Sequence, residues 1–182
     1  MMPDARGLPS AWIVQWAGLI APGAPVLDVA AGGGRHGRFL AARGHKVTAI
    51  DRDIGALLGN ADIESIQADL EDGSPWPLSG RTFGAVVVTN YLHRPLFPVL
   101  LQSLEPGGVL LYETFMEGNE RFGRPTNPEF LLKDGELLEV VRGRFSVMAY
   151  EARLVSEPKT AMVQRIAARL AGPRASRPAS ET

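Results

Sequence analysis

The sequence predicts an α/β fold in which helices cover both faces of a mostly parallel β-sheet, in three α/β/α layers. Short apolar runs alternate along the chain with segments whose apolar residues recur at helical spacing, a pattern typical of βαβ units. A glycine cluster, Gly32 to Gly34, follows the first of these runs, and two later runs end at or just before Asp51 and Asp69. Because the carboxyl ends of parallel strands meet at one edge of a sheet, we expect these residues to lie close together.

The first elements are a helix, a strand and a second helix. Apolar residues at helical spacing, with Trp12 and Trp16 among them, predict a helix from Ser10 to Ile20 that is buried by its tryptophans. The run Pro25 to Ala30 predicts a strand, and Arg35 to Arg43 predicts a helix that ends before a glycine.

The middle of the chain supplies three more strands and a helix. Strands are predicted over Lys46 to Ile50 and Ile63 to Gln67, and Phe83 to Thr89 is apolar enough for a strand that is covered on both faces. A helix is predicted from about Leu96 to Leu104. A Pro-Gly-Gly turn then leads into a strand from Val109 to Thr114.

The last part begins with a loop, Glu117 to Asn127. A helix near Glu136 to Val141 and two strands, Phe145 to Leu154 and Ala161 to Ala168, follow it. Residues 171–182 lack apolar periodicity, and we expect them to be a disordered tail.

Composition limits the kinds of protein that this chain can be. Its 182 residues suit a single domain, expected over residues 1–170. The 19 Lys and Arg against 20 Asp and Glu give a net charge of −1, which disfavours a nucleic-acid partner. The sequence has no cysteine, which excludes disulfides and thiolate metal sites. Because it has only three histidines, we expect no protein-bound metal. We expect no membrane span and a cytoplasmic location.

The glycine cluster and Asp51 together indicate a nucleoside site. Glycines without a Cβ let the backbone turn sharply and approach a ligand closely, and the following helix directs free N–H groups toward that ligand. Asp51 lies 19 residues beyond Gly32, at the tip of the next strand. A carboxylate at that position can accept hydrogen bonds from both hydroxyls of a ribose.

The same segments resemble the motifs of class I S-adenosylmethionine-dependent methyltransferases. Five segments carry the resemblance in the family's order: Val26 to His36, Val47 to Asp51, Asp69-Leu70, Phe83 to Asn90, and Leu104 to Leu110. It covers about Trp12 to Leu170. Within the class, Gly34-Arg35-His36 and Arg43-Gly44-His45 are loosely similar to the small tellurite-resistance-type methyltransferases. Ala30 stands where the family often has glycine, and it tightens the loop slightly.

The resemblance implies a Rossmann-like sheet of about seven strands with an antiparallel last strand, and S-adenosylmethionine as the cofactor. The methionine part would contact Asp28 and the backbone of Ala30, Gly32 and Gly34. On the nucleoside side, the implied contacts are Asp51 with the ribose, Arg52 beside the adenine, Asp69 with Leu70 at the adenine edge, and Asn90 from the fourth strand. Asp69 as a helix cap and Arg52 as a solvated charge are the structural alternatives.

The glycines alone leave a second hypothesis open. The spacing Gly32-x-Gly34-x-x-Gly37 also fits a dinucleotide fingerprint, so an NAD(P)-dependent oxidoreductase is the alternative. Three features favour S-adenosylmethionine. Asp28 would repel a pyrophosphate, Asp69 can face the adenine, and the sequence has no Tyr-x-x-x-Lys pair for hydride chemistry. A cofactor-binding module without catalysis is a third hypothesis.

Methyl transfer from a sulfonium is an in-line displacement that proximity and water exclusion can accelerate. At the tip of the fourth strand, His93 can accept a proton from a hydroxyl or amine nucleophile, or it can pair with backbone at a helix start. Five residues are candidate substrate contacts: His36, Tyr91, Arg94, Arg121 and Arg124. For His36 a place on the helix surface, and for the two loop arginines a solvated position, are the alternatives. Asn90-Tyr91 lacks the Pro-Pro of enzymes that methylate amides and bases.

The sequence therefore predicts a methyltransferase that acts on an unidentified small molecule. We expect a monomer or a homodimer, with no nucleic-acid or membrane partner. The loop Glu117 to Asn127 leaves the fifth strand at the same sheet edge, so we expect it to act as a lid.

Overall fold

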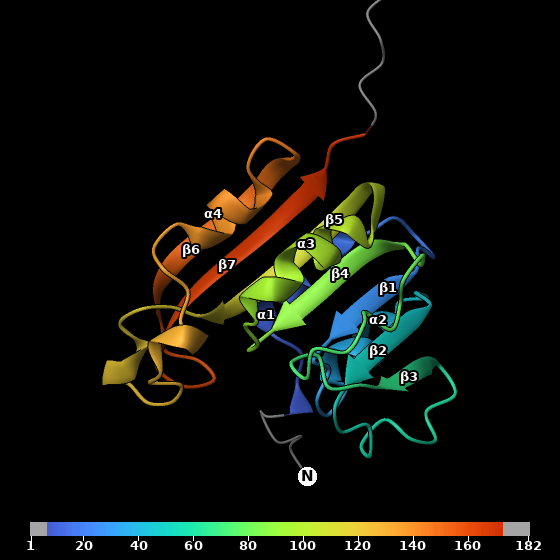
Figure 1. Ribbon diagram of the computed structural model, residues 1–182, viewed down its shortest axis with the longest axis horizontal. Helices are drawn as coiled ribbons and strands as arrows, with labels where there is room; N and C mark the ends of the chain where they lie inside the picture. The colour runs from blue at the N-terminus through green and yellow to red at the C-terminus, as the bar shows by residue number, and fades with distance from the viewer. Residues whose placement is uncertain (1–6, 173–182) are drawn as a thin grey trace, which may run out of the picture.

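A seven-stranded sheet forms the centre of the computed structural model, which describes residues 7–172 (Figure 1). The strands are β1 (Val26–Val29), β2 (Val47–Asp51), β3 (Ile63–Gln67), β4 (Phe83–Thr89), β5 (Leu104–Phe115), β6 (Phe145–Val155) and β7 (Ala161–Leu170). They lie in the order β3-β2-β1-β4-β5-β7-β6. Most of the expected tail, residues 173–182, lies outside the described residues.

The predicted antiparallel last strand is confirmed. Strands β1 to β5 pair in parallel, whereas β7 pairs antiparallel with both β5 and β6. Strand β7 therefore lies inside the sheet and β6 forms its edge. The turn between β6 and β7, residues 156–160, comes out at the same end as the carboxyl end of β5, because Phe115 pairs with Val163 near the start of β7.

Helices cover both faces, as the three-layer prediction required. On one face, α1 (Ala11–Trp16) and α2 (Arg35–Ala41) pack against inward-facing strand residues such as Val26 and Val87. On the other face, α3 (Phe97–Gln102) and α4 (Glu136–Val141) cover the alternate strand positions, such as Leu27 and Val86. The alternation follows from the two-residue period of a strand.

The N-terminal helix is held by its tryptophans, as predicted. Trp12 is 2% exposed and donates its indole N–H to the carbonyl of Ile166 at 3.3 Å. Ser10 caps this helix by accepting the N–H of Trp12 at 3.1 Å. A 3₁₀ turn, Ala17–Leu19, continues α1 toward the first strand.

The boundaries at the junction of α3 and β5 differ from the sequence prediction. Strand β5 begins at Leu104, so the Pro-Gly-Gly segment lies within it as an irregularity instead of a separate turn. Gly107 there adopts a φ of +81°, and the register of β4 against β5 shifts between Phe83 and Ala85. The helix α3 correspondingly ends at Gln102. A 3₁₀ turn, Arg94–Leu96, precedes its first residue.

The part of the sheet nearest β3 has less helical cover. Residues 52–62 and 68–82, which connect β2 to β3 and β3 to β4, form turns and irregular backbone.

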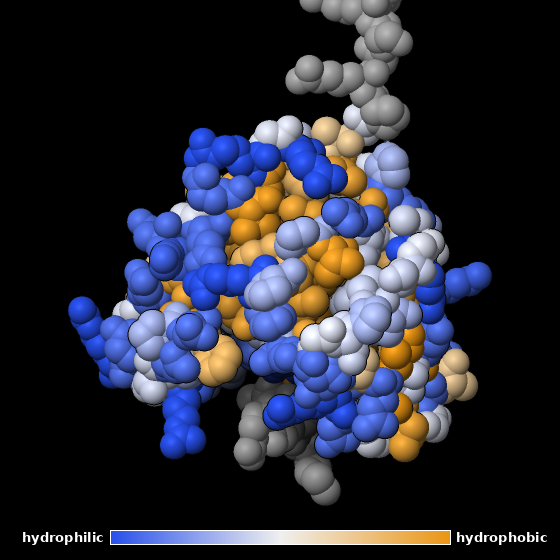
Figure 2. All heavy atoms as spheres, in the orientation of Figure 1, coloured by the Kyte–Doolittle hydropathy of each residue, from blue (hydrophilic) through white to orange (hydrophobic). Residues whose placement is uncertain are grey.

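Figure 2 shows apolar side chains gathered between α3 and α4, where partly buried residues such as Leu138 and Phe97 pack on the core. Within residues 7–172 no helix has the length and apolar character that crossing a bilayer requires.

Candidate functional site

Two residues with left-handed backbone mark the carboxyl ends of neighbouring strands. Ala30 follows β1 with a φ of +52°, and Asn90 follows β4 with a φ of +53°. Strands β1 and β4 pair directly, so these two turns lie side by side. Non-glycine residues in this conformation cost energy and cluster at functional sites. Asn90 is held there by its N–H, which donates to the carbonyl of Glu113 at 2.9 Å.

The glycine loop is packed closely at one position and open at the others. A Cβ on Gly34, whose φ is +72°, would come within 2.2 Å of Leu57 Cδ2. A Cβ on Gly32 or Gly33 would meet no atom within 4 Å. Gly34 is therefore required by the fold, whereas the other two glycines leave free space above the loop.

Asp51 connects the loop to the end of β2. Its Oδ2 accepts the N–H of Gly32 at 2.8 Å, and its Oδ1 accepts the N–H of Asp53 at 2.9 Å. Each carboxylate oxygen has two lone pairs. Asp51 can therefore accept two further hydrogen bonds from a ligand without releasing the loop.

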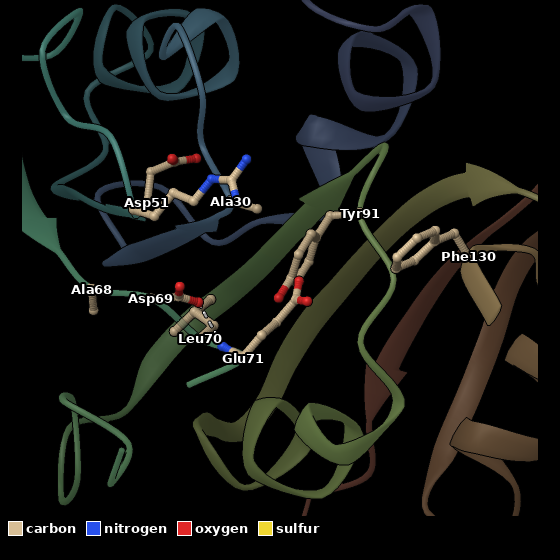
Figure 3. Close-up of a pocket in the computed structure, with 9 residues that line it drawn as sticks. Ala30, Asp51, Ala68, Asp69, Leu70, Glu71, Tyr91 and Phe130 are labelled. Atoms are coloured by element: carbon tan, nitrogen blue, oxygen red, sulfur yellow. Dashed lines mark hydrogen bonds between the residues drawn. The ribbon is translucent and has the colours of Figure 1, made fainter. Parts of the chain in front are cut away.

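A hollow of about 360 Å³ lies beside Asp51, and we call it the Asp51 hollow (Figure 3). It is lined by Ala30, Asp51, Arg52, Ala68, Asp69, Leu70, Glu71, Tyr91 and Phe130. The predicted contacts Asp51, Arg52, Asp69 and Leu70 are thus brought together. Asp69 accepts the N–H of Glu71 at 2.9 Å, which shapes the turn that follows β3.

A second hollow of about 500 Å³, the glycine-loop hollow, adjoins the first at Ala30. It is lined by Gly7, Ala30, Ala31, Gly32, Gly33, Arg35, His36, Arg38, Thr89 and Asn90. The two adjoining hollows, which we call the cleft, lie along the carboxyl ends of β2, β1 and β4. Open α/β sheets bind their ligands at this edge.

A third space of about 320 Å³, the Lys159 cavity, lies beyond the glycine loop. It shares Arg35 and Asn90 with the glycine-loop hollow. Its other walls come from residues 8–11, the ends of β5 and β7, and the turn between β6 and β7. Sequence analysis did not predict this cavity.

Asp28 lies beneath the loop and does not line any of these three spaces. Its side chain is 1% exposed, and its Oδ2 accepts the N–H of Gly37 at 3.0 Å. Its Oδ1 has no hydrogen-bond partner within residues 7–172. Burial raises the pKa of this carboxyl from 3.8 to about 7, despite the opposing effect of the Gly37 N–H.

His36 is buried rather than on the helix surface. Its Nε2 accepts the N–H of Ser10 at 3.1 Å, so Nδ1 carries the proton and donates to Thr89 Oγ1 at 3.2 Å. Burial, with the nearby charge of Arg35, lowers its pKa from 6.5 to about 3. A neutral histidine with both ring nitrogens engaged holds α2, β4 and the N-terminal segment together.

Tyr91 contributes the wall of the Asp51 hollow that faces Glu71 (Figure 3). Burial raises the pKa of the Tyr91 hydroxyl, and the neighbouring Glu71 carboxylate adds to this effect. Tyr91 was predicted as a substrate contact, and the structure places it beside Asp51 and Asp69; Ala68, Glu71 and Phe130 were not predicted. Position could have indicated Glu71, which comes two residues after Asp69.

Arg94 is occupied by the protein itself. Its guanidinium makes two hydrogen bonds to Glu136, at 2.7 and 2.8 Å, and donates to the carbonyls of Glu129 and Leu131. This clamp fixes the segment that carries Phe130. His93 precedes the 3₁₀ turn without capping it, and it does not line the spaces described above.

The segment expected to form a lid is anchored at Asn119, which is 1% exposed. Its amide donates to the carbonyls of Gly123 and Pro125 and accepts the N–H of Met162. Arg121 and Arg124 are exposed, and neither lines the hollows or the Lys159 cavity. Their contact with a substrate and the closing motion stay predictions.

Comparison with known proteins gives similarity in structure only. No protein-family model matches the sequence, and no curated protein matches it. TehB from Haemophilus influenzae is similar in structure, with a TM-score of 0.74 and 18% identity over 89% of this chain. The chain spans 62% of the length of that protein.

Two further structures show the same similarity over more of their own length. An S-adenosylmethionine-dependent methyltransferase from Mesorhizobium loti has a TM-score of 0.67 and 17% identity over 91% of this chain and all of that one. The 1,6-didemethyltoxoflavin-N1-methyltransferase of Burkholderia thailandensis, with its acceptor and S-adenosylhomocysteine bound, has a TM-score of 0.66 and 20% identity, covering 92% of this chain and 80% of that one. The chain therefore has the Rossmann-like fold of S-adenosylmethionine-dependent methyltransferases.

Proposed function

We propose that this protein is an S-adenosylmethionine-dependent methyltransferase with a small-molecule acceptor. The observation that carries the proposal is the pair of adjoining hollows that extend from Asp51 past Ala30 to Asn90, at the carboxyl ends of three adjacent parallel strands. Structures with this fold include methyltransferases with S-adenosylhomocysteine bound.

The residues of the Asp51 hollow suit an adenosine group. The free lone pairs of Asp51 would accept both ribose hydroxyls. Asp69 and Leu70 would contact the adenine edge, and Arg52 would flank the ring. Ala30 continues the same wall toward the glycine loop, so the ligand would lie across the end of β1.

The glycine-loop hollow suits the methionine part. The open space above Gly32 and Gly33 admits the chain of an amino acid without steric conflict. Arg35 lines this hollow and forms no ion pair within residues 7–172, so we assign it to the methionine carboxylate. Asp28, beneath the loop, would act mainly by holding the N–H of Gly37 and thus the shape of the turn.

When bound, S-adenosylmethionine supplies an electrophilic methyl group on a sulfonium. The protein's part is to hold the acceptor in line with that group and to exclude water. Asn90 lines both the glycine-loop hollow and the Lys159 cavity, so it lies where the cofactor and an acceptor would meet. We assign no proton transfer to His93, because it does not line either space.

Thermal unfolding in the presence of four ligands tests the proposal. S-adenosylmethionine and S-adenosylhomocysteine should raise the Tm, because a ligand at a hundredfold above its Kd adds about 2.7 kcal/mol of stability. NAD and NADP should leave the Tm unchanged. Selective stabilisation by NAD or NADP would instead support the oxidoreductase alternative.

A panel of acceptors separates an enzyme from a binding module. Transfer of a labelled methyl group to any small molecule, reduced in Asn90→Ala, supports the proposal. Cofactor binding without transfer to any member of a broad panel would favour the binding module.

A further inference from the structure

The Lys159 cavity adjoins the proposed cofactor cleft at one end. Arg35 and Asn90 line both spaces, so a molecule in the cavity would meet a cofactor at these residues. The opposite end is formed by the turn between β6 and β7, where Lys159 lies. A ligand there would present one end to the cofactor and the other to Lys159.

The walls between these two ends are largely apolar. The apolar lining includes Leu8, Pro9, Phe115, Pro158 and Val163. A cavity of about 320 Å³ with such walls suits a small organic molecule. The apolar walls favour a ligand with an apolar body.

The charged residues that line the cavity differ in whether they form ion pairs within the protein. Arg165 pairs with Glu113 at 2.9 Å and with Glu151 at 3.1 Å, so its charge is neutralised within the protein. Lys159, like Arg35 at the cofactor end of the cavity, forms no ion pair within residues 7–172. Its Nζ lies 5.6 Å from the centroid of the Phe115 ring, which places the ammonium against the aromatic wall of the cavity. Glu157, an exposed carboxylate of the same turn, also lines the cavity and opposes an anion there.

We infer that the Lys159 cavity receives the methyl acceptor and that Lys159 selects an acceptor with an apolar body and an anionic group. The assignment of the bound molecule as acceptor rests on the proposed function; the preference for an anion rests on the cavity alone. Lys159 holds the anionic group at the far end, so the nucleophilic atom of the acceptor points toward Asn90. Lys159 is thus a residue that determines specificity.

The test uses benzoate as the anionic probe and benzamide as its neutral counterpart of similar shape. Both are titrated by NMR into the full chain with and without S-adenosylhomocysteine. Benzoate should bind more tightly than benzamide to the wild-type protein. Lys159→Gln should weaken benzoate binding about tenfold, because it removes a charge-assisted hydrogen bond, whereas Lys159→Arg should retain it. Equal binding of the two probes, or benzoate binding unchanged by Lys159→Gln, would overturn the inference.

Two further variants control for general effects. Glu157→Gln removes the opposing carboxylate and should tighten benzoate binding. Lys46→Gln removes an exposed lysine just before β2, at the opposite end of the sheet, and should change nothing. Loss of benzoate binding in Lys46→Gln would show that net charge, not Lys159, is responsible and would overturn the inference.

Calorimetry with S-adenosylhomocysteine on the same variants separates the two proposals. The Kd for S-adenosylhomocysteine should be the same in Lys159→Gln as in the wild type. If S-adenosylhomocysteine binds but benzoate does not, only the anionic preference fails. If benzoate binds but S-adenosylhomocysteine does not, the cavity selects anions and the methyltransferase proposal fails.

Discussion

Ser10 donates its backbone N–H to Nε2 of His36 at 3.1 Å, although 26 positions separate the two residues. The Ser10 hydroxyl also donates to Glu113 at 2.7 Å, at the carboxyl end of β5. These two bonds hold the N-terminal segment against the ends of the strands. The segment thereby becomes a wall of both the glycine-loop hollow, through Gly7, and the Lys159 cavity, through Leu8 and Pro9.

Ser10→Ala should therefore reduce stability. The change removes the cap on the N–H of Trp12 and the hydrogen bond to Glu113. Loss of a serine cap costs about 0.5–2 kcal/mol, and urea unfolding measures the difference. Ser146→Ala, at an exposed position in β6, is the matched control and should be neutral. Equal stability of the two variants would contradict the capping role.

The pH dependence of stability should contain two opposing contributions, from His36 and Asp28. The folded-state pKa of His36 is about 3, below its ordinary 6.5, so between these values the unfolded chain binds the extra proton. Stability from His36 is therefore lost as the pH falls from 6.5. The folded-state pKa of Asp28 is about 7, above its ordinary 3.8, so in that interval the folded chain holds the extra proton and stability is gained as the pH falls.

Asp28→Asn should reveal the histidine contribution. Asparagine can still accept the N–H of Gly37 but does not titrate. As the pH is lowered from 6.5 to 3.8, the free energy of unfolding of the variant should fall more steeply than that of the wild type. The two slopes should differ by at most about 1.4 kcal/mol per pH unit, the value for one proton. Urea unfolding across this interval measures both slopes. Parallel profiles would show that Asp28 does not titrate there.

Asp51→Asn should weaken cofactor binding while the fold is retained. The change removes the negative charge and one of the two oxygens that would accept the ribose hydroxyls. Because a hydrogen bond to a charged group is worth about 1.5–3 kcal/mol, the Kd for S-adenosylmethionine should rise roughly ten- to hundredfold. Asp53→Asn is the control, since Asp53 is exposed and its side chain bonds only to the N–H of Gly55 among the described residues. Calorimetry showing the same affinity for both variants would refute the role of Asp51.

Gly33→Ala and Gly34→Ala should separate binding from stability. A methyl group on Gly34 would collide with Leu57 in a left-handed backbone, so Gly34→Ala should destabilise the protein by about 1–3 kcal/mol. A methyl group on Gly33 meets no protein atom but enters the glycine-loop hollow. Gly33→Ala should therefore unfold like the wild type and bind S-adenosylmethionine less tightly. The opposite pattern would show that the hollow does not bind the cofactor.

The fold could be predicted in most of its parts because local signals agreed with one another. The strands Ile63–Gln67 and Phe83–Thr89 and the helix Glu136–Val141 have the predicted bounds. Phe83–Thr89 and Glu136–Val141 are rich in apolar residues and are enclosed by polar or glycine residues. The predicted start of β5 at Val109 was wrong, because pairing with β4 overrides the turn preference of Pro-Gly-Gly.

The site was less accessible to sequence reasoning. Asp51 and Asp69 could be placed, because strand ends in a parallel sheet share an edge. Phe130 and Lys159 reach the site only through tertiary contacts, namely the Arg94 clamp and the turn between β6 and β7. The burial of His36 likewise depends on Ser10, whose position relative to α2 no local pattern specifies.

The limited helical cover around β3 makes the two sides of the cleft unequal in local stability. Residues 68–72 bound the Asp51 hollow with turns, whereas β1 and β4 are central strands with ladder bonds on both sides. Amides of the turns should exchange with solvent hydrogen by local opening, and those of the central strands only by global unfolding. We therefore expect a nucleoside ligand bound in the Asp51 hollow to leave by a small opening on the side of β3, while the protein remains folded around the glycine loop.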